Sequence, residues 1–325
     1  YDAALVCSMP DAVVVCAVAL KLLGTRLILD VHDTMPELYL YKFSGRRGAF
    51  GARLLQLEER ASALVANRVL AVHDLHRIRL EAAGIPAEKI RVVLNSPDPR
   101  IFSSLDGRRT RTEFFTLVCH GTITRRLGLD VAFKAIGLLR ETIPTLRLMV
   151  IGDGDYLPAA RDLVAQMRLD ERVNFLSPVP IEKLPAVLEQ ADVGIVPNQP
   201  SAATHLMLPV KMMEYATLGI PIIAARLRTI EHYFGDDAAL LFEPGDAGAL
   251  ADAIENLYAN RERAAALARR ASQVADKLSW MHQREHFFAA IDDLLPRKRA
   301  TGSKAAKPLE MERTVDAHAP TRSDR

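Results

Sequence analysis

The sequence predicts an α/β protein of two domains, each built on a parallel sheet. Short, nearly continuous apolar runs alternate with amphipathic stretches along most of the 325 residues. Strands that are apolar throughout are typical of parallel sheets covered by helices on both faces. The length suits two domains, and a hydrophobic content of 49% is ample for two cores.

The first half of the chain alternates strands with helices and predicts a first domain over residues 1–95. Its apolar runs predict strands over residues 4–7, 26–31, 68–72 and 90–94, and its amphipathic stretches predict helices over 11–23, 48–65 and 74–83. Residues 96–112 then combine Ser, Pro, Asp and Arg without periodicity. This composition is typical of a linker between domains.

The second half repeats the same alternation and predicts a second domain over residues 113–270. Strands are expected over residues 115–120, 147–151, 173–175, 193–196, 222–225 and 239–242, with helices over 129–141, 157–168, 181–190, 210–218 and 247–260. A final helix is expected over residues 271–295, packing across both domains with the aromatic side chains of Trp280, Phe287 and Phe288 in the core.

Residues 296–325 are basic and poor in large apolar residues. From residue 297 to the end, eight Lys or Arg stand against four Asp or Glu. Such a composition predicts a disordered tail, either solvated or in contact with anionic lipid. The whole chain carries a formal charge of only +2, so we expect no nucleic-acid partner.

Cysteine usage and hydropathy predict a cytoplasmic protein. Cys7, Cys16 and Cys119 lie in apolar runs without metal-ligand spacing, which favours reduced, buried thiols and no metal. His73 and His76 also lack a partner pattern and are expected at the surface. No run reaches the ~20 apolar residues of a membrane span, so membrane contact would be peripheral, at the inner face.

The segment from Pro209 to residue 224 is the most informative of the chain. It predicts a helix that begins at Pro209, ends before Gly219 and leads into a buried strand. Lys211 and Glu214 lie one turn apart near the start of that helix. A cation, a carboxylate and free N–H groups could hold a ligand with phosphates and hydroxyls. The alternative is an ordinary helix with a salt bridge.

Several polar loops follow strands of the second half, where open parallel sheets bind ligands. Gly121 and Thr122 follow one strand and precede Arg125 and Arg126, so that loop combines close backbone approach with two phosphate-binding side chains. Gly152 follows another strand. The backbone near Val179 follows a third strand and could meet a base. Each loop alone could equally be a solvated turn.

In the first half, His32 and Asp33 follow a strand. A histidine there could hydrogen-bond a substrate hydroxyl, with Asp33 orienting the histidine or acting as a base. The alternative is helix-start chemistry, since Thr34, Pro36 and Glu37 come next.

Together these segments resemble the retaining, nucleotide-sugar-dependent glycosyltransferases of the GT-B fold, in the "group 1" (family-four-like) class. The resemblance implies that both predicted domains are Rossmann-like. The resemblance extends over residues 1–295 and is strongest at residues 120–122, 150–154, 191–197 and 209–224. It implies transfer of a hexose, with retention, from a nucleotide diphosphate sugar to a glycan or lipid-linked acceptor in polysaccharide or cell-envelope glycan synthesis. It also implies that the N-terminal domain is incomplete and lacks its first βα units.

The resemblance assigns roles to individual residues. Glu214 would bind the donor ribose, and His32, with Asp33 beside it, would lie near the transferred sugar. The class has a further acid eight residues before Glu214, where this chain has Leu206. His205 or backbone amides would therefore meet the sugar.

The donor phosphates are assigned differently from the usual pattern of the class. The positions that usually carry the phosphate-binding Arg and Lys hold Thr122 and Leu127, so Arg126 and Lys211 are the expected replacements, with Arg125 as an alternative. Fixed cations of this kind would stabilise the leaving diphosphate without a metal or another cofactor. Two alternatives remain, a sugar-nucleotide epimerase of the same fold and a donor-binding module without activity.

Overall fold

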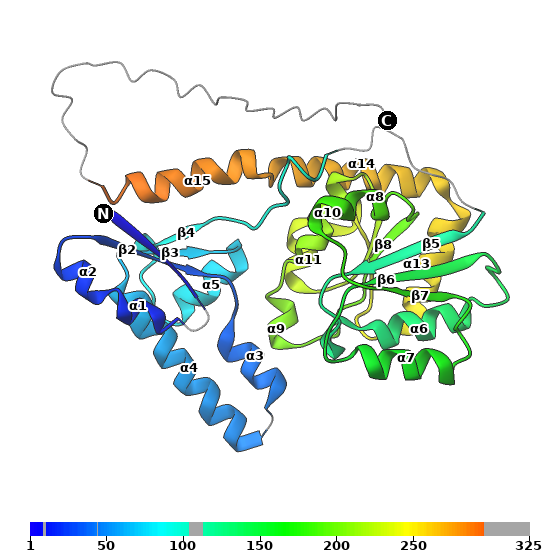
Figure 1. The fold of residues 1–325 in the computed structure, drawn as a ribbon, viewed down its shortest axis with the longest axis horizontal. Helices are drawn as coiled ribbons and strands as arrows, with labels where there is room; N and C mark the ends of the chain where they lie inside the picture. Colours follow the sequence, from blue (N-terminus) through cyan, green and yellow to red (C-terminus); the bar gives the residue numbers. More distant parts are fainter. Residues whose placement is uncertain (9–10, 44, 104–112, 296–325) are drawn as a thin grey trace, which may run out of the picture. The chain divides into compact units, whose positions relative to one another are not determined.

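The computed structural model describes residues 1–8, 11–43, 45–103 and 113–295, and contains two separate parallel sheets (Figure 1). A four-stranded sheet has the order β1-β2-β3-β4, and a six-stranded sheet has the order β10-β9-β8-β5-β6-β7. Every strand pair is parallel. The predicted fold class, two parallel α/β sheets, is confirmed.

The first sheet has strands close to the predicted ranges. They are β1 (Ala3–Cys7), β2 (Arg26–Val31), β3 (Arg68–Ala71) and β4 (Ile90–Val92), and the helices around them are α1 (Val13–Cys16), α2 (Val18–Leu22), α3 (Met35–Lys42), α4 (Gly45–Val65) and α5 (Asp74–Ala82). The helix expected over residues 11–23 is thus two short helices. The chain also contains α3, which the sequence suggested only as helix-start chemistry.

The second sheet forms the larger core and closely follows the predicted alternation. Its strands are β5 (Phe115–His120), β6 (Leu146–Ile151), β7 (Val173–Leu176), β8 (Val193–Val196), β9 (Ile222–Ala225) and β10 (Leu240–Phe242). Its helices are α6 (Leu129–Leu138), α7 (Leu157–Gln166), α8 (Leu184–Leu188), α9 (Ala202–His205), α10 (Val210–Thr217), α11 (Arg228–Tyr233), α12 (Gly235–Ala238) and α13 (Ala247–Ala259). Short 3₁₀ helices lie at Arg125–Leu127 and Ile181–Lys183 in this half and at Ala87–Lys89 in the first half. The strand order reverses at β5, which pairs with both β6 and β8. Ligands of open parallel sheets bind at such a point.

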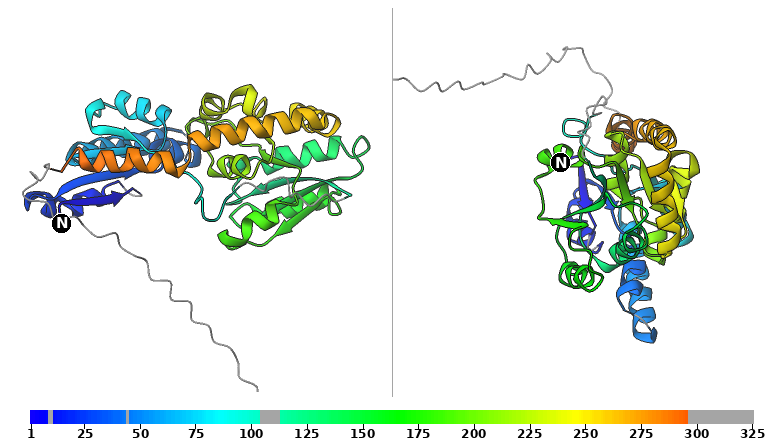
Figure 2. Two further views of the ribbon diagram at one scale, coloured as in Figure 1. Left: turned by 90° about the horizontal axis from the view of Figure 1, so that it is seen from above. Right: turned by 90° about the vertical axis from the view of Figure 1, so that its right-hand side faces the viewer.

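The single final helix expected over residues 271–295 is wrong, because two helices occupy this part of the chain. α14 (Arg261–Lys277) packs on the second sheet, and α15 (Trp280–Asp292) packs on the first (Figures 1 and 2). Trp280 and Phe288 are 40% and 56% exposed, so they are not core residues as expected. Phe287 does pack against the buried cluster around Leu70.

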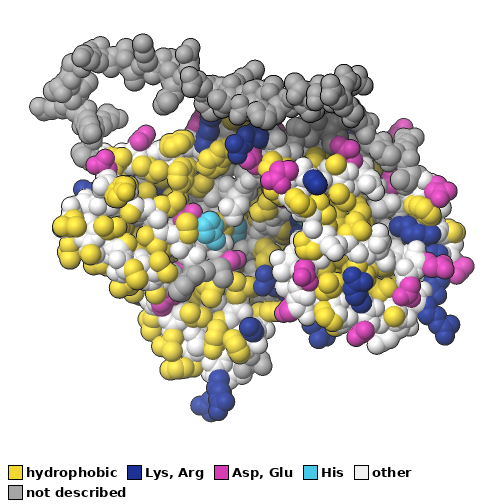
Figure 3. Space-filling view, in the orientation of Figure 1, with side chains coloured by type: hydrophobic (Ala, Val, Ile, Leu, Met, Phe, Trp, Pro, Cys, Tyr) yellow, Lys and Arg dark blue, Asp and Glu magenta, His cyan; other side chains and the backbone are white. Residues whose placement is uncertain are grey.

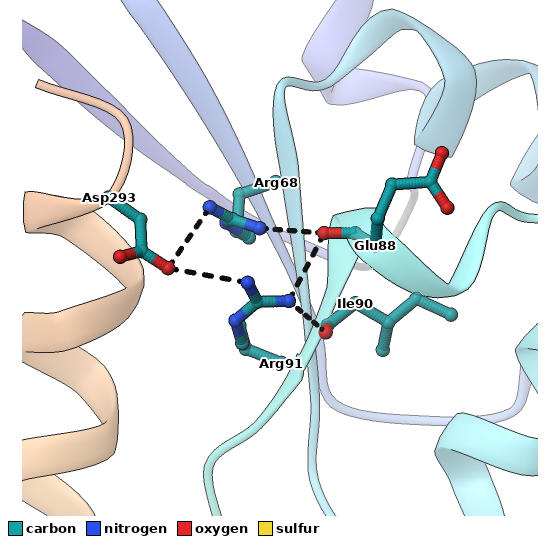
Figure 4. A network of polar contacts seen from close by, with 5 residues as sticks. All are labelled: Arg68, Glu88, Ile90, Arg91 and Asp293. Atoms are coloured by element: carbon teal, nitrogen blue, oxygen red, sulfur yellow. Dashed lines mark hydrogen bonds and ion pairs between the residues drawn. The ribbon is translucent and has the colours of Figure 1, made fainter.

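The end of α15 is attached to the first sheet by a polar network (Figure 4). The carboxylate of Asp293 lies 3.5 Å from the Arg68 guanidinium and 3.3 Å from that of Arg91. Arg68 also donates to the carbonyl of Glu88 at 2.7 Å. These bonds join α15 to β3 and β4, which are far away in the sequence.

The cysteine prediction is only partly correct. Cys119 is buried on β5, whereas Cys7 and Cys16 are exposed. Among the described residues, Cys7 lies on β1, which pairs with β2 alone and is therefore an edge strand of its sheet. Within the same ranges, no helix is long and apolar enough to cross a bilayer. The predicted tail, residues 296–325, and most of the predicted linker lie outside the described residues.

Candidate functional site

The predicted helix after Pro209 is confirmed and places Glu214 in a buried position. α10 follows Pro209, whose φ of −67° suits a helix start, and ends at Thr217, with Leu218 as its C-cap. Gly219 then takes a φ of +67°, the left-handed conformation that glycine adopts most easily. Lys211 and Glu214 make no ion pair with each other within the described ranges. The alternative of a simple salt bridge on this helix is thus not what the structure contains.

Glu214 instead pairs with His120 at the end of β5. Oε2 of Glu214 lies 2.5 Å from Nε2 of His120, and Nδ1 of His120 lies 2.9 Å from the hydroxyl of Tyr215. Burial lowers the pKa of His120, although Glu214 acts in the opposite direction. A neutral imidazole therefore donates to Glu214 through Nε2 and accepts from Tyr215 through Nδ1. This buried pair could not be recognised in the sequence, because its two residues are far apart in the chain.

Close backbone packing explains the glycines at the ends of β5 and β6. Gly152 has a φ of +140°, and a Cβ added there would lie 2.0 Å from the carbonyl oxygen of Gly121. A Cβ on Gly121 would lie 3.6 Å from Nζ of Lys211. The lysine amine of α10 therefore lies beside the loop after β5, as a phosphate-binding role requires.

A cavity of about 280 Å³ opens at these strand ends. Four of the predicted donor-binding residues line it, namely Gly121, Thr122, Gly152 and Val179. His120 lines it too and connects it to Glu214 on α10. The structure therefore brings together loops that follow different strands in the sequence.

The two candidate arginines differ in their surroundings. Arg125 is exposed, whereas Arg126 is half-buried. Nε of Arg126 is buried and has no hydrogen-bond partner among the described residues. The backbone carbonyl of Arg126 accepts from Gln199 at 2.9 Å, which fixes the loop beside β8. A buried donor without a partner favours Arg126 over Arg125 as a ligand-binding group.

A second cavity, of about 240 Å³, has His32 and Asp33 in its lining together with Pro209 and Val210. The start of α10 therefore faces the predicted catalytic residues. Asp33 does not orient His32, however. Nε2 of His32 lies 3.3 Å from Oδ2 of Asp30, two residues earlier on β2. Side chains two apart on a strand share a face, so strand alternation could have indicated Asp30.

His73 and His76 also line this second cavity, and the expectation that they lie at the surface is wrong. They are 1% and 0% exposed. His73 caps α5 by accepting from the backbone N–H of His76, so its Nε2 carries the proton and donates to the carbonyl of Leu206 at 2.9 Å. Burial lowers the pKa of His76 to about 3, and neither of its ring nitrogens has a partner among the described residues.

Leu206, which replaces the expected acid, presents its backbone carbonyl to His73 rather than a side-chain carboxylate. His205 lines neither of the two cavities. Its Nδ1 accepts from the backbone N–H of Arg228 at 3.3 Å, and its pKa is lowered by burial and by Arg228. Arg125, Arg126, Lys211 and Glu214 are also absent from both linings, so cavity lining does not separate His205 from these four predicted donor-binding residues.

The first sheet gathers three possible metal ligands that sequence spacing did not reveal. Atoms of Cys7, Asp30 and His32 lie within 4.8 Å of one another. Cys7 and Asp30 are opposite each other in the register of β1 and β2. The ligands come from β1, from β2 and from the residue just after β2, so no local sequence motif indicates the group.

Residues 115–260 match the family model described as glycosyl transferases group 1. The chain carries a group 1 glycosyltransferase domain. This domain contains β5 to β10, α10 and the cavity at the strand ends.

Curated relatives of this glycosyltransferase domain include two bacterial enzymes. A putative colanic acid biosynthesis glycosyltransferase of Escherichia coli is 30% identical over 185 residues, which are 56% of this chain and 45% of that protein. A GDP-mannose-dependent phosphatidylinositol monomannoside mannosyltransferase of Mycolicibacterium smegmatis is 27% identical over 175 residues, which are 53% of this chain and 46% of that protein. The chain thus spans about half the length of the curated relatives it matches.

Solved structures show that the chain has the GT-B fold. Anabaena HepE in complex with UDP-glucose matches with a TM-score of 0.71 at 18% identity, over 90% of this chain and 79% of that chain. Sucrose-phosphate synthase from Thermosynechococcus elongatus matches with a TM-score of 0.74 at 18% identity, over 90% of this chain and 74% of that chain.

Proposed function

We propose that this protein transfers a hexose from a nucleotide diphosphate sugar to a glycan or lipid-linked acceptor, with retention of configuration. The observation that carries the proposal is the placement of α10, whose Glu214 is held by His120 while Lys211 lies beside Gly121. A carboxylate, an amine and free helix N–H groups thus meet at one sheet edge, where a sugar nucleotide could bind.

In this proposal, Glu214 accepts hydrogen bonds from the ribose hydroxyls. Its Oε2 is taken by His120, and its side chain keeps 10% exposure. A neutral His120 can hold Glu214 in place without competing as a second cation, because burial lowers its pKa. The backbone near Val179, in the lining of the cavity, is positioned to meet the base.

Lys211 and Arg126 bind the diphosphate. As the bond to the sugar breaks, negative charge grows on the departing nucleotide diphosphate. Fixed cations and the N-terminal N–H groups of α10 stabilise that charge most when water is excluded. Gly121 and Gly152 serve the same purpose, because the absence of a side chain lets phosphates approach the backbone.

His32 is the group nearest the transferred sugar in this proposal, and Asp30 orients it. Both His32 and the first residues of α10 belong to the lining of the second cavity. The ring could therefore hydrogen-bond a sugar hydroxyl while the diphosphate stays at the helix start.

The comparisons support a transferase over an epimerase, because the matching family and both curated relatives described above are glycosyltransferases. One relative is named as GDP-mannose-dependent, and one solved neighbour holds UDP-glucose. Colanic acid synthesis in another relative supports a role in polysaccharide synthesis. Because the GDP-mannose-dependent relative and the neighbour that holds UDP-glucose differ in their nucleotide, the test below includes both UDP-sugars and GDP-sugars.

The test is to incubate the protein with radiolabelled UDP- and GDP-sugars and a mixture of glycan and lipid-linked acceptors. Label in a larger product supports the proposal, and the anomeric configuration of that product tests retention. An interconverted sugar nucleotide would instead indicate an epimerase. Binding of a donor without turnover would indicate a donor-binding module.

A further inference from the structure

Helices α3 and α4 form a closely packed hairpin (Figure 1). A Cβ added to Gly51 would lie 2.4 Å from the ring of Tyr39, and one added to Gly48 would lie 1.8 Å from the carbonyl oxygen of Phe43. Two glycines on α4 therefore let α3 pack against its backbone. Because the two helices pack this closely, the side chains on the outer surface of the hairpin are held in fixed positions relative to one another.

That outer surface is apolar. Phe50, Leu54 and Leu57 on α4 are 65%, 50% and 64% exposed, and their spacing of four and three residues places them on one face of the helix. Three further side chains at the end of α3 are exposed by more than two-fifths, namely Leu40, Tyr41 and Phe43. We call these six residues the hairpin face.

The charges within residues 38–57 have one sign, and the acidic residues Glu37 and Glu58 flank this range. Residues 38–57 contain four basic residues and no acidic residue. The four are all exposed and have no ion pair among the described residues, namely Lys42, Arg46, Arg47 and Arg53. The space-filling view shows hydrophobic side chains over the region of α3 and α4, with Lys or Arg side chains at its end (Figure 3).

A cavity of about 540 Å³ adjoins the hairpin face at Leu57. Arg53 and Arg60 line it, and both are exposed without an ion pair among the described residues. Arg79 and Glu37 line it as well, and Arg79 is paired with both Glu37 and Glu59. The guanidinium groups of Arg53 and Arg60, which have no ion pair among the described residues, could therefore bind a phosphate at the edge of an apolar surface.

We propose that the hairpin face docks on an anionic lipid bilayer, with Phe50, Leu54 and Leu57 in the interface and the arginines on lipid phosphates. An apolar face with basic neighbours is the pattern of helices that lie in a membrane interface. A second copy of this chain would bring four cations against four cations, which disfavours self-association. Membrane docking would give the protein access to a lipid-linked acceptor. Only this role of the docking rests on the proposed function.

The test is flotation of the full chain with vesicles of phosphatidylcholine alone or mixed with phosphatidylglycerol, without any sugar donor. We expect binding to the anionic vesicles only, weakened by salt. The triple variant Phe50→Ser, Leu54→Ser, Leu57→Ser should lose it. The matched control is the double variant Leu22→Ser, Leu23→Ser. Both leucines are 83% exposed but lie at the end of α2, outside the hairpin face, so this variant should bind normally.

A charge variant separates the basic residues from the apolar ones. Arg46→Gln, Arg47→Gln and Arg53→Gln together should weaken binding by about fivefold per cation removed. Exposed arginines of the last two helices serve as the control, changed as Arg269→Gln, Arg270→Gln and Arg284→Gln. Unchanged binding in both hairpin variants would assign the contact to another part of the chain and overturn the proposal. So would a dimer, seen by sedimentation without vesicles, that the serine variant abolishes.

A second inference comes from Cys7, Asp30 and His32 at the carboxyl ends of β1 and β2. Cys7 is opposite Asp30 in register, and His32 follows on the same face of β2. Nε2 of His32 lies 3.3 Å from Oδ2 of Asp30, and the thiol lies within 4.8 Å of both ligand atoms. The geometry points to a site for one thiophilic divalent cation such as Zn²⁺.

Thiolate, imidazole and carboxylate are the ligand types that Zn²⁺ takes, at bond lengths of about 2.0–2.3 Å. Cys7 and His32 are exposed, so both side chains can be reached by an ion from solvent. Binding would release the thiol proton of Cys7 and leave a fourth position for water. It would also occupy His32 and so inhibit the proposed transfer.

The test is a titration of the full chain with Co²⁺ under a non-thiol reductant, followed by the thiolate-to-metal absorption band. We expect a band that Zn²⁺ displaces and that Cys7→Ser removes. Cys16→Ser is the matched control, because Cys16 is also exposed but lies outside the group. A band that survives Cys7→Ser, or none in the unmodified chain, would overturn the site whether or not the protein is a transferase.

Discussion

His120 and Glu214 are 94 residues apart in the chain, and their side chains meet with Nε2 and Oε2 2.5 Å apart. Because Glu214 is 8% exposed, its substitution tests two roles at once. Glu214→Ala leaves the ring nitrogen of His120 unpaired and should lower the free energy of unfolding by about 1–3 kcal/mol. Chemical denaturation measures that loss.

Glu214→Gln separates binding from stability. The amide can still pair with His120, so stability should change less than in Glu214→Ala. The charge that would hold the ribose is lost, so donor affinity should fall by about 1.5–3 kcal/mol, the range for hydrogen bonds to charged groups. Calorimetry with a nucleotide sugar tests this, and Glu255→Gln on the exposed side of α13 is the control. Unchanged affinity in Glu214→Gln would remove Glu214 from the donor site.

The double variant Arg126→Ala, Lys211→Ala should weaken nucleotide diphosphate binding. If both charges are desolvated beside the phosphates, the loss is about 2–5 kcal/mol. The Nε of Arg126 is buried without a partner among the described residues, whereas Arg125 is exposed. Arg125→Ala is therefore the matched control and should change affinity little. A loss confined to Arg125→Ala would show that the choice of arginine is wrong.

Gly152 and Gly219 both have a positive φ, but only Gly152 is crowded. A Cβ at Gly152 would lie 2.0 Å from the carbonyl oxygen of Gly121, and one at Gly219 would meet nothing within 4 Å. Gly219→Ala should cost about 1 kcal/mol, and Gly152→Ala should cost more, on the order of 3 kcal/mol. Thermal unfolding of the two variants compares them. Equal losses of stability in the two variants would contradict this prediction, because they would mean that the loops after β5 and β6 move apart at little cost to accommodate the added Cβ.

Asp11 should make stability depend on pH. It is 1% exposed, and its carboxylate oxygens have no partner among the described residues. Burial first, then Glu58 and Glu59, raise its pKa from the ordinary 3.8 to about 7. The folded state therefore binds more protons than the unfolded state between these values, and stability falls as the pH rises through this window.

Asp11→Asn should abolish this dependence, because an amide does not titrate. At pH 8 the variant should be more stable than the unmodified protein, on the order of 2 kcal/mol, and at pH 4 the difference should shrink. Urea denaturation at both pH values measures it. Parallel pH curves for the two proteins would show that Asp11 does not titrate as described.

Patterns that depend on a single element could be predicted from the sequence. The strands and α10 were found because apolar runs, a proline and a glycine mark their limits locally. The break between α14 and α15 at Leu278 and Ser279 was missed, because neither residue is a strong helix breaker.

Features that depend on contacts between distant segments could not be predicted. His73 and His76 have the local sequence of a polar helix start, and only the cavity lining and the carbonyl of Leu206 reveal their burial. The pairing of His120 with Glu214 needs the second sheet to place β5 beside α10. The choice of Asp30 over Asp33 was within reach, because alternation along a strand already places Asp30 and His32 on one face.

The position of α10 restricts how this segment can change in length. Pro209 and Val210 belong to one cavity, while Glu214 is bonded to a residue that lines the other. Removing or inserting one residue between them would turn Glu214 by about 100° around the helix axis, away from His120. Libraries that redesign this segment should therefore vary side chains at constant length, and homologous segments should be exchanged only when their spacing is the same.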